Sequence, residues 1–141
     1  MLHVIAYDIG TTGVKTGLIS VGETVELVAD AYQGYDLYIL ENGGAEQDAD
    51  QWWSAMCETT RSLMKKSPVP PEKIDGISFC SQMQGLVLVD KEGNALRRPM
   101  SYMDQRAGDQ LRKGLAHGIQ IAGANVGKLL TSLRLTGAVS S

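Results

Sequence analysis

Several features that define common classes of protein are scarce in this chain. It has two cysteines and two histidines in 141 residues, too few for a disulfide framework and without the spacing of a metal site. Its 13 basic residues are outnumbered by 16 acidic ones, and a net charge of −3 does not favour nucleic acid or an anionic membrane as a partner. These shortages favour a reducing, cytoplasmic environment.

Long apolar runs are also lacking. No stretch approaches the length needed to cross a membrane, and Asp8 interrupts the apolar start of the chain. No basic region precedes that start, so a signal peptide is not expected. The composition, 43% apolar and 21% charged, is typical of a soluble globular protein, and the length suffices for a hydrophobic core.

Three short apolar segments at the start of the chain have the composition of strands. The connections between them are too short for a parallel crossover, so antiparallel pairing is predicted. The predicted strands are 4–9, 14–21 and 24–32. A glycine-rich loop follows, with a short extended piece at 38–40.

A helix is predicted to begin after Asp48, which can cap it, with Gln51 reaching back to complete a capping box. Trp52, Trp53 and Met56 lie close to one face at helical spacing and are assigned to the core. Three prolines between positions 68 and 71 end the helix.

The helix is expected to act as a crossover to a fourth strand at 74–80 that lies parallel in the sheet. A hairpin with arms at 86–89 and 96–102 follows, and a second helix is predicted to open at Asp104. The order of elements predicts an α/β or α+β layered domain.

The segment AYDIGTTGVKTGLI places Asp8 and a turn of small residues between two strands. One interpretation is a tight hairpin, with glycines for unusual backbone angles and Asp8 bonded into the turn. The other is a phosphate-binding turn, in which backbone N–H groups and the hydroxyls of Thr11 and Thr12 approach an anion. Asp8 would then hold Mg²⁺, and Lys15 is either a phosphate partner or a solvated strand residue. The pattern alone leaves both interpretations open.

Two other phosphate-binding motifs are excluded. Neither glycine-containing stretch that includes Lys15 or Lys128 has the G-x-x-x-x-G-K-[ST] spacing of a Walker loop. The glycines after Asp8 precede a strand, whereas the dinucleotide-binding fingerprint opens a helix.

Four separated segments, in this order, carry a resemblance: DIGTTGVK, AEQDADQWW, GISFCSQMQGLVLVDKEGNALR and SYMDQRA. Each is weak alone, but the ordered set, spanning residues 5–107, resembles the N-terminal part of the FGGY family of carbohydrate kinases, in particular its xylulokinase-like branch. The resemblance implies a ribonuclease H-like nucleotide-binding domain of the actin, hexokinase and Hsp70 type. It also implies ATP-dependent phosphorylation of a sugar, either a ketose such as xylulose or a related polyol.

The resemblance also implies roles for individual residues. Asp8 belongs to the Mg²⁺ site, and the phosphate-binding residues are Thr11, Thr12, Gly13 and Lys15. The sugar-binding residues are Gln82, Met83, Gln84, Tyr102, Asp104 and Arg106. For Asp104 and Arg106 the alternative is a helix cap and an ion pair.

Two positions depart from the family pattern. Gln84 stands where xylulokinase-like members usually have His, and a glutamine still hydrogen-bonds but does not titrate near neutral pH. Tyr102 stands where the family commonly has Trp, and it offers a ring face and a hydroxyl. These departures leave the sugar open more than the reaction.

The family's catalytic base and second domain are not found in this chain, so residues 1–141 are expected to be an incomplete N-terminal kinase domain that is inactive alone. The expected partner is a small-molecule sugar, and the resemblance is compatible with a homodimeric full-length protein. Two other functions stay open: a non-catalytic sugar- or phosphate-binding module, and an actin- or Hsp70-like scaffold that uses the nucleotide as a switch.

Overall fold

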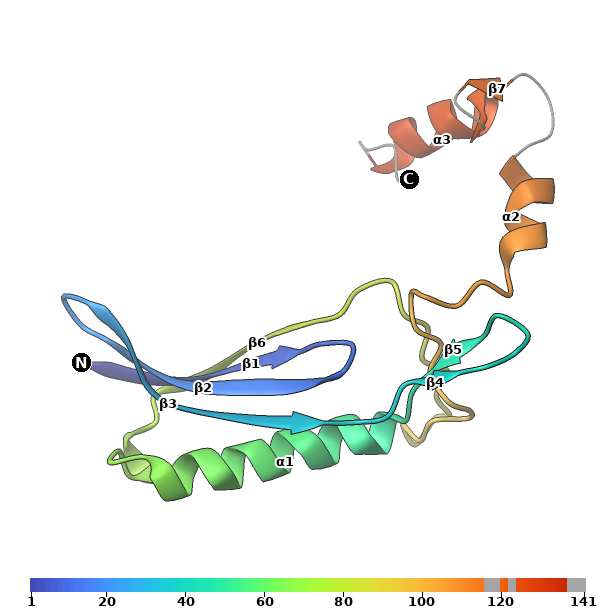
Figure 1. The fold of residues 1–141 in the computed structure, drawn as a ribbon. Coiled ribbons are helices and arrows are strands. Elements are labelled where there is room, and N and C mark those ends of the chain that lie inside the picture. The colour runs from blue at the N-terminus through green and yellow to red at the C-terminus, as the bar shows by residue number, and fades with distance from the viewer. Residues whose placement is uncertain (116–119, 122–123, 137–141) are drawn as a thin grey trace. The chain divides into compact units, whose positions relative to one another are not determined.

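In a computed structural model of the protein, residues 1–115, 120–121 and 124–136 are described. They belong to two units, Met1–Asp104 and Gln105–Ser141. Figure 1 gives the element labels.

The first unit is built on a four-stranded sheet with the strand order β3-β2-β1-β6. β1 (Leu2–Ile9), β2 (Gly13–Val21) and β3 (Val25–Gly34) pair as antiparallel neighbours. β6 (Gly76–Ser81) pairs with β1 in parallel. The antiparallel start and the parallel fourth strand are therefore confirmed.

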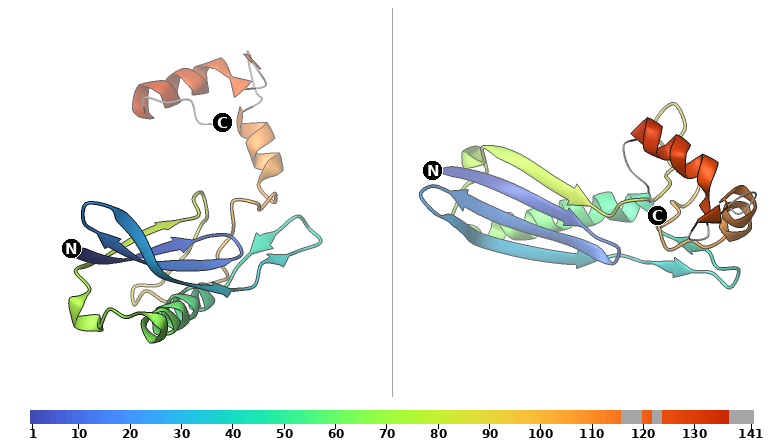
Figure 2. Two further views of the ribbon diagram at one scale, coloured as in Figure 1. Left: turned by 60° about the vertical axis from the view of Figure 1, so that its left-hand side comes forward. Right: turned by 90° about the horizontal axis from the view of Figure 1, so that it is seen from above.

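α1 (Ala49–Lys66) connects these two parts of the sheet and lies against one face of it, beneath β2 and β3 (Figures 1 and 2). Its predicted cap is confirmed, because the carboxylate of Asp48 accepts a hydrogen bond of 2.9 Å from the backbone N–H of Asp50. The predicted capping box is wrong, because the amide of Gln51 instead bonds Asp36 through both its oxygen and its nitrogen, at 2.9 Å each. A short 3₁₀ helix, η1 (Pro71–Lys73), follows the prolines.

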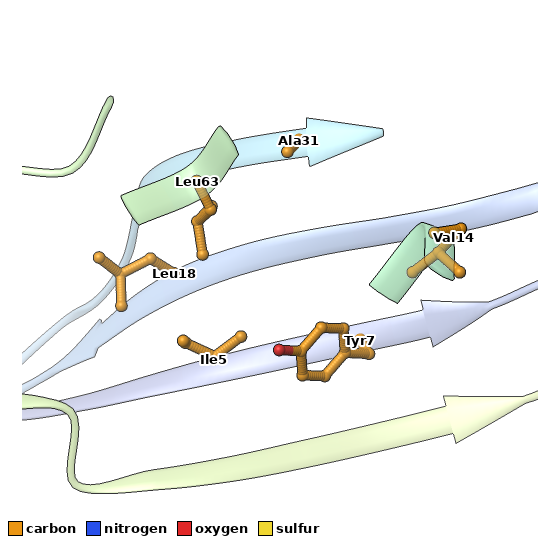
Figure 3. Close-up of a cluster of buried hydrophobic side chains, with 7 residues drawn as sticks. Ile5, Tyr7, Val14, Leu18, Ala31 and Leu63 are labelled. Atoms are coloured by element: carbon orange, nitrogen blue, oxygen red, sulfur yellow. The ribbon is translucent and has the colours of Figure 1, made fainter. Parts of the chain in front are cut away.

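The core lies between α1 and the sheet. Apolar side chains from the two elements meet there (Figure 3): Ile5, Tyr7, Val14, Leu18, Ala31, Ala55 and Leu63. A buried polar contact joins the same layers, since the hydroxyl of Thr16 donates to that of Thr59 at 2.7 Å. The helix thus presents Ala55, Thr59 and Leu63, at four-residue spacing, to the sheet.

The face of α1 that packs on the sheet is not the face predicted from the tryptophans. Trp53 is 67% exposed, so its placement in the core is wrong. Met56 packs against the core while staying partly buried, and Trp52 is half-buried at the start of the helix. Helical spacing identified an apolar stripe, but the stripe is centred on Ala55, Thr59 and Leu63 instead.

Two hairpins follow or extend the sheet. β4 (Tyr38–Ile39) and β5 (Ala45–Glu46) form a short antiparallel pair within the predicted glycine-rich loop. The added hairpin at 86–102 is present, but its arms are not regular strands. Isolated bridges join them, at Leu86 and Met100 and at Val89 and Ala95. A two-stranded hairpin has little stability of its own, and Pro99 lacks a backbone N–H to donate.

The second unit contains α2 (Gly108–Leu115), the short pair β7 (Gln120–Ile121) and β8 (Ala124–Asn125), and α3 (Val126–Thr136). The second helix begins at Gly108 and not after Asp104, so the cap interpretation of Asp104 is wrong. The Asp104 carboxylate instead accepts a hydrogen bond of 3.1 Å from the backbone N–H of Ala45. Across residues 1–115, 120–121 and 124–136, no helix combines the length and the apolar character of a membrane span.

Candidate functional site

The carboxyl ends of β1 and β6 bring two predicted binding segments together. Asp8 is paired in register with Cys80, and Ile9 with Ser81, so the turn after β1 and the loop after β6 leave the sheet at the same edge. A hydrogen bond of 2.8 Å from the backbone N–H of Gln82 to the carbonyl of Ile9 extends this pairing. Carboxyl ends of parallel strands are the usual position of ligand sites in α/β sheets.

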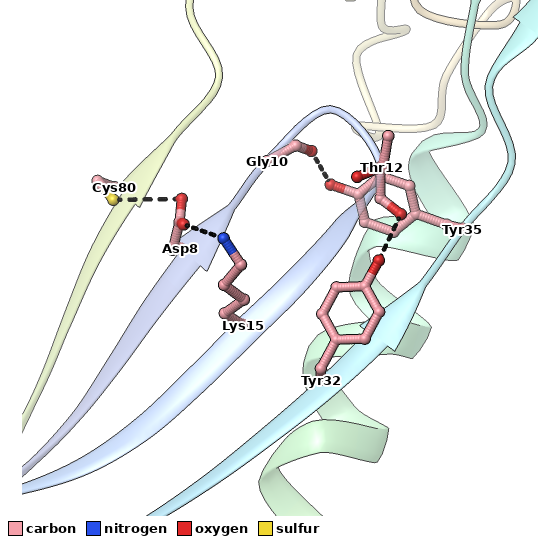
Figure 4. Close-up of polar contacts among 7 residues, drawn as sticks. All are labelled: Asp8, Gly10, Thr12, Lys15, Tyr32, Tyr35 and Cys80. Carbon is pink, nitrogen blue, oxygen red and sulfur yellow. Dashed lines mark hydrogen bonds and ion pairs between the residues drawn. The ribbon is translucent and has the colours of Figure 1, made fainter. Parts of the chain in front are cut away.

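The carbonyl groups of the turn after β1 are held by the protein. The Tyr35 hydroxyl donates to the carbonyl of Gly10, and the Tyr32 hydroxyl donates to that of Thr12 at 3.2 Å (Figure 4). The side-chain amide of Gln47 donates to the carbonyl of Thr11 at 2.7 Å. Three successive carbonyls are therefore anchored by side chains from β3, the segment after it and the residue before Asp48.

This anchoring fixes where the N–H groups of the turn point. In a planar trans peptide the C=O and N–H bonds point in opposite directions. Carbonyls of Gly10 and Thr11 that face the protein therefore turn the N–H groups of Thr11 and Thr12 away from it. Among the described residues, neither of these N–H groups has a protein acceptor. The turn thus offers adjacent donors of the kind that bind phosphate.

The neighbours of the turn support this geometry. Burial raises the pKa of Tyr35 to about 12, and the Asp8 carboxylate and Tyr32 add to the effect. Tyr35 therefore remains a hydrogen-bond donor at neutral pH. Gly13 is required for a different reason: a Cβ there would lie 2.6 Å from the carbonyl oxygen of Gln33 and 2.6 Å from the Tyr32 hydroxyl.

Asp8 lies beside this turn with its carboxylate half-exposed. One oxygen is 3.6 Å from the ammonium of Lys15, and the other is 3.7 Å from the thiol of Cys80 (Figure 4). The Lys15 side chain is 74% exposed, so the ion pair is weak and exchangeable. In this geometry Lys15 is a partner of Asp8, and its role toward phosphate stays a prediction.

The donor set fits Mg²⁺ and does not fit a metal held by protein alone. Among the described residues, no group of three or more His, Cys, Asp or Glu side chains could hold an ion. Mg²⁺ usually takes one or two carboxylates and completes its shell with water and substrate phosphates. An open carboxylate beside free N–H groups is that arrangement, and Asp8 would hold the ion.

A pocket of about 340 Å³ lies between the sheet edge, the loop after β6 and the start of α1. Its lining includes Gln82 and Gln84 of the predicted sugar-binding set, together with Ile9, Gln47, Trp52, Ser81, Gly85, Val87, Met100 and Ser101. Gln84 has a φ of 62°, the left-handed conformation that is unusual for a residue other than glycine. Strained backbone of this kind is concentrated at ligand sites.

The remaining predicted sugar-binding residues do not line this pocket. Met83 is 78% exposed, and Tyr102 is 53% exposed. The Asp104 carboxylate is bonded to Ala45, and Arg106 is half-buried in a turn of the second unit before α2. The structure therefore brings Gln82 and Gln84 to one pocket beside the turn after β1, and the sugar contacts of all six residues stay predictions.

Gln47 and Trp52 are pocket residues that the sequence interpretation missed. Gln47 is 1% exposed and bonds both the turn and Gln82. The indole N–H of Trp52 and the side-chain oxygen of Gln82 are buried without a hydrogen-bond partner in the part of the chain that the structure describes. A polar residue immediately before a helix cap was the available signal for Gln47, but nothing local distinguishes it from a solvated loop residue.

The sequence and the fold of this chain are similar to those of known proteins. The sequence model for the N-terminal domain of the FGGY family of carbohydrate kinases matches residues 3–124. The chain is 36% identical over 110 residues to a xylulose kinase of Bacillus subtilis, covering 78% of this chain and 22% of that protein. It is 30% identical over 118 residues to a gluconokinase of the same organism, covering 84% of this chain and 21% of that protein.

A solved structure has a similar fold. The xylulose kinase from Rhodospirillum rubrum matches with a TM-score of 0.72 and 27% identity, covering 97% of this chain and 30% of that one. The predicted ribonuclease H-like fold is thereby confirmed. The chain spans 22% and 21% of the two curated relatives, which is about a fifth of their length.

Proposed function

This chain belongs to the FGGY family of carbohydrate kinases, and we propose that the full-length protein carrying it transfers phosphate from ATP to a hydroxyl group of a ketose or related polyol. The observation that carries the proposal is the meeting of two loops at one sheet edge. The turn after β1 presents free backbone donors, and the loop after β6 walls a pocket with amide side chains.

The phosphate side of the site is assigned to the turn. Thr11, Thr12 and Gly13 contact nucleotide phosphate. The Lys15 ammonium also binds phosphate when its weak ion pair with Asp8 breaks. Asp8 holds Mg²⁺, which when bound neutralises charge on the phosphates. Phosphoryl transfer depends mainly on positioning and charge neutralisation. Fixed backbone N–H donors and one accessible carboxylate are suited to this reaction.

The sugar side is assigned to the loop after β6 and the segment that follows the hairpin. A sugar presents hydroxyls that both donate and accept, and a glutamine amide matches both roles. Gln82 and Gln84 are the side chains at the pocket wall. The proposed set is completed by Met83, Tyr102, Asp104 and Arg106.

The base that accepts the proton of the sugar hydroxyl is assigned to a part of the protein outside residues 1–141, as is the adenosine site. The cytoplasm is the proposed compartment, and a homodimer is the proposed assembly. Relatives named xylulose kinase and gluconokinase make pentuloses and gluconate the first substrates to test.

The test is a screen of the purified full-length protein for sugar-dependent ADP release with MgATP. The panel contains both enantiomers of xylulose, other pentuloses and hexuloses, polyols and gluconate. Release above the sugar-free rate with one ketose or polyol is expected. A folded protein that binds a panel sugar without releasing ADP would be a binding module and would contradict the proposal.

A further inference from the structure

Gln47 connects the two halves of the candidate site through a single side chain. Its amide nitrogen donates to the carbonyl of Thr11 at 2.7 Å, and its amide oxygen accepts from the side-chain nitrogen of Gln82 at 2.6 Å. Resting on the proposed function, we propose that Gln47 is a positioning residue that couples occupancy of the pocket to the phosphate turn.

The surroundings hold Gln47 in place for this role. Its backbone N–H donates to the carbonyl of Pro99 at 3.0 Å, and the next residue, Asp48, caps α1. The preceding residue, Glu46, is ion-paired with Arg97 at 2.6 Å. The side chain is 1% exposed, so water does not compete for either of its hydrogen bonds. Both the nitrogen and the oxygen of its side-chain amide are hydrogen-bonded, and a change of either partner would lose a buried hydrogen bond.

The pocket end of the connection has an unused acceptor. The side-chain oxygen of Gln82 is buried and has no hydrogen-bond partner among the described residues. A buried acceptor without a donor is costly, and a hydroxyl group supplied by a pocket ligand removes that cost. Because Gln82 lines the pocket, we assign a sugar hydroxyl as the donor to this oxygen.

With that hydroxyl bound, the three hydrogen bonds that connect the pocket to the turn all have the same donor-to-acceptor direction. The hydroxyl donates to Gln82, Gln82 donates to Gln47, and Gln47 donates to the carbonyl of Thr11. Hydrogen bonds aligned in this way polarise one another. The Thr11 carbonyl shares its peptide unit with the N–H of Thr12, one of the free donors of the turn. Sugar binding therefore strengthens and fixes a donor that faces the nucleotide.

The coupling is measured as the ratio of sugar dissociation constants without and with a non-hydrolysable MgATP analogue, using full-length protein and the best sugar of the screen. Coupling between two sites changes affinity by roughly 5–150-fold in typical proteins, and the ratio is the same in either order of binding. Gln47→Met keeps the length of the side chain and removes its amide. We expect this variant to bring the ratio close to one.

Gln51→Met is the matched control. Gln51 also joins α1 to a preceding loop through two amide hydrogen bonds, both to Asp36, and among the described residues neither of them involves the turn or Gln82. Its coupling ratio is expected to equal that of the wild type. Gln47→Glu is the second variant, because its carboxylate retains an acceptor for Gln82 and, when ionised, cannot donate to Thr11. It is also expected to lose the coupling.

Three outcomes separate the hypotheses. Loss of coupling in both Gln47 variants, with Gln51→Met unchanged, supports the positioning role. A kinase whose wild-type ratio is one, or whose ratio is equal in folded Gln47→Met, Gln47→Glu and wild type, overturns this inference and leaves the proposed function standing. Sugar binding without any sugar-dependent ADP release in the wild type overturns the proposed function instead.

Discussion

The backbone N–H of Gln82 donates a hydrogen bond of 2.8 Å to the carbonyl oxygen of Ile9. This contact continues the parallel pairing of β6 with β1 by one residue beyond the last residue pair of the two strands. It places the loop that walls the pocket directly beside the turn that presents free backbone donors. A kinase must hold its two substrates in contact, and this relationship places their predicted binding segments side by side.

Replacement of Gly13 by alanine tests the close approach at the turn. The added Cβ would lie 2.6 Å from the backbone oxygen of Gln33, which cannot move without disturbing β3. We expect a loss of about 1–3 kcal/mol in stability, typical of overpacking, together with weaker MgATP binding. Thermal unfolding and nucleotide titration of the full-length protein measure both.

Gly76→Ala is the control for that substitution. Gly76 also begins a strand of the sheet, but no atom lies within 4 Å of its added Cβ. Its stability and nucleotide binding are expected to match the wild type. Equal melting temperatures for the two variants would show that the approach at Gly13 is not tight.

Gln84 provides a prediction that separates backbone strain from ligand contact. Its φ of 62° is unfavourable for a side chain with a Cβ, and glycine removes that cost. Gln84→Gly is expected to be more stable than Gln84→Ala by about 1 kcal/mol. Both variants lose the amide, so both should raise the KM for sugar while leaving the KM for MgATP unchanged. A stable Gln84→Gly with wild-type sugar KM would remove Gln84 from the sugar site.

The titration of Tyr35 tests its burial beside the turn. Its pKa is raised to about 12, so between pH 10 and 12 the folded protein retains a phenolic proton that the unfolded chain has released. This contribution to stability is complete below pH 10 and is lost as pH rises through 12. The ultraviolet difference between wild type and Tyr35→Phe should show a tyrosine that ionises near pH 12. Ionisation near pH 10 would contradict the burial.

The strands and the first helix could be predicted because their signals are local. Apolar segments between short turns define β1, β2 and β3, and Asp48 followed by an apolar stripe defines the start of α1. The parallel placement of β6 followed from the intervening helix, which acts as a crossover. The turn between β1 and β2 was also predictable, since small residues between two strands are contiguous in sequence, and its role toward phosphate stays a prediction.

Contacts between distant segments could not be predicted. The face of α1 that is buried depends on where the sheet lies, which is why Trp53 was misassigned. The link from Thr11 through Gln47 to Gln82 joins three segments, and each glutamine alone is consistent with a polar loop. The partner of Asp104 is likewise 59 residues away at Ala45. Sequence patterns of helices and caps contain no information about such pairs.

The central claim, that Asp8 and the turn after β1 form the metal and phosphate side of a sugar kinase, is tested most directly by Asp8→Asn in the full-length protein. The rate of sugar-dependent ADP release at saturating substrates is measured beside the sugar dissociation constant, with Asp30→Asn, an exposed carboxylate of β3, as the control. We predict that kcat falls by about 10²–10³-fold, as for loss of a preorganised electrostatic contact, while sugar affinity is unchanged. Normal turnover with a collapse of sugar binding would contradict the claim.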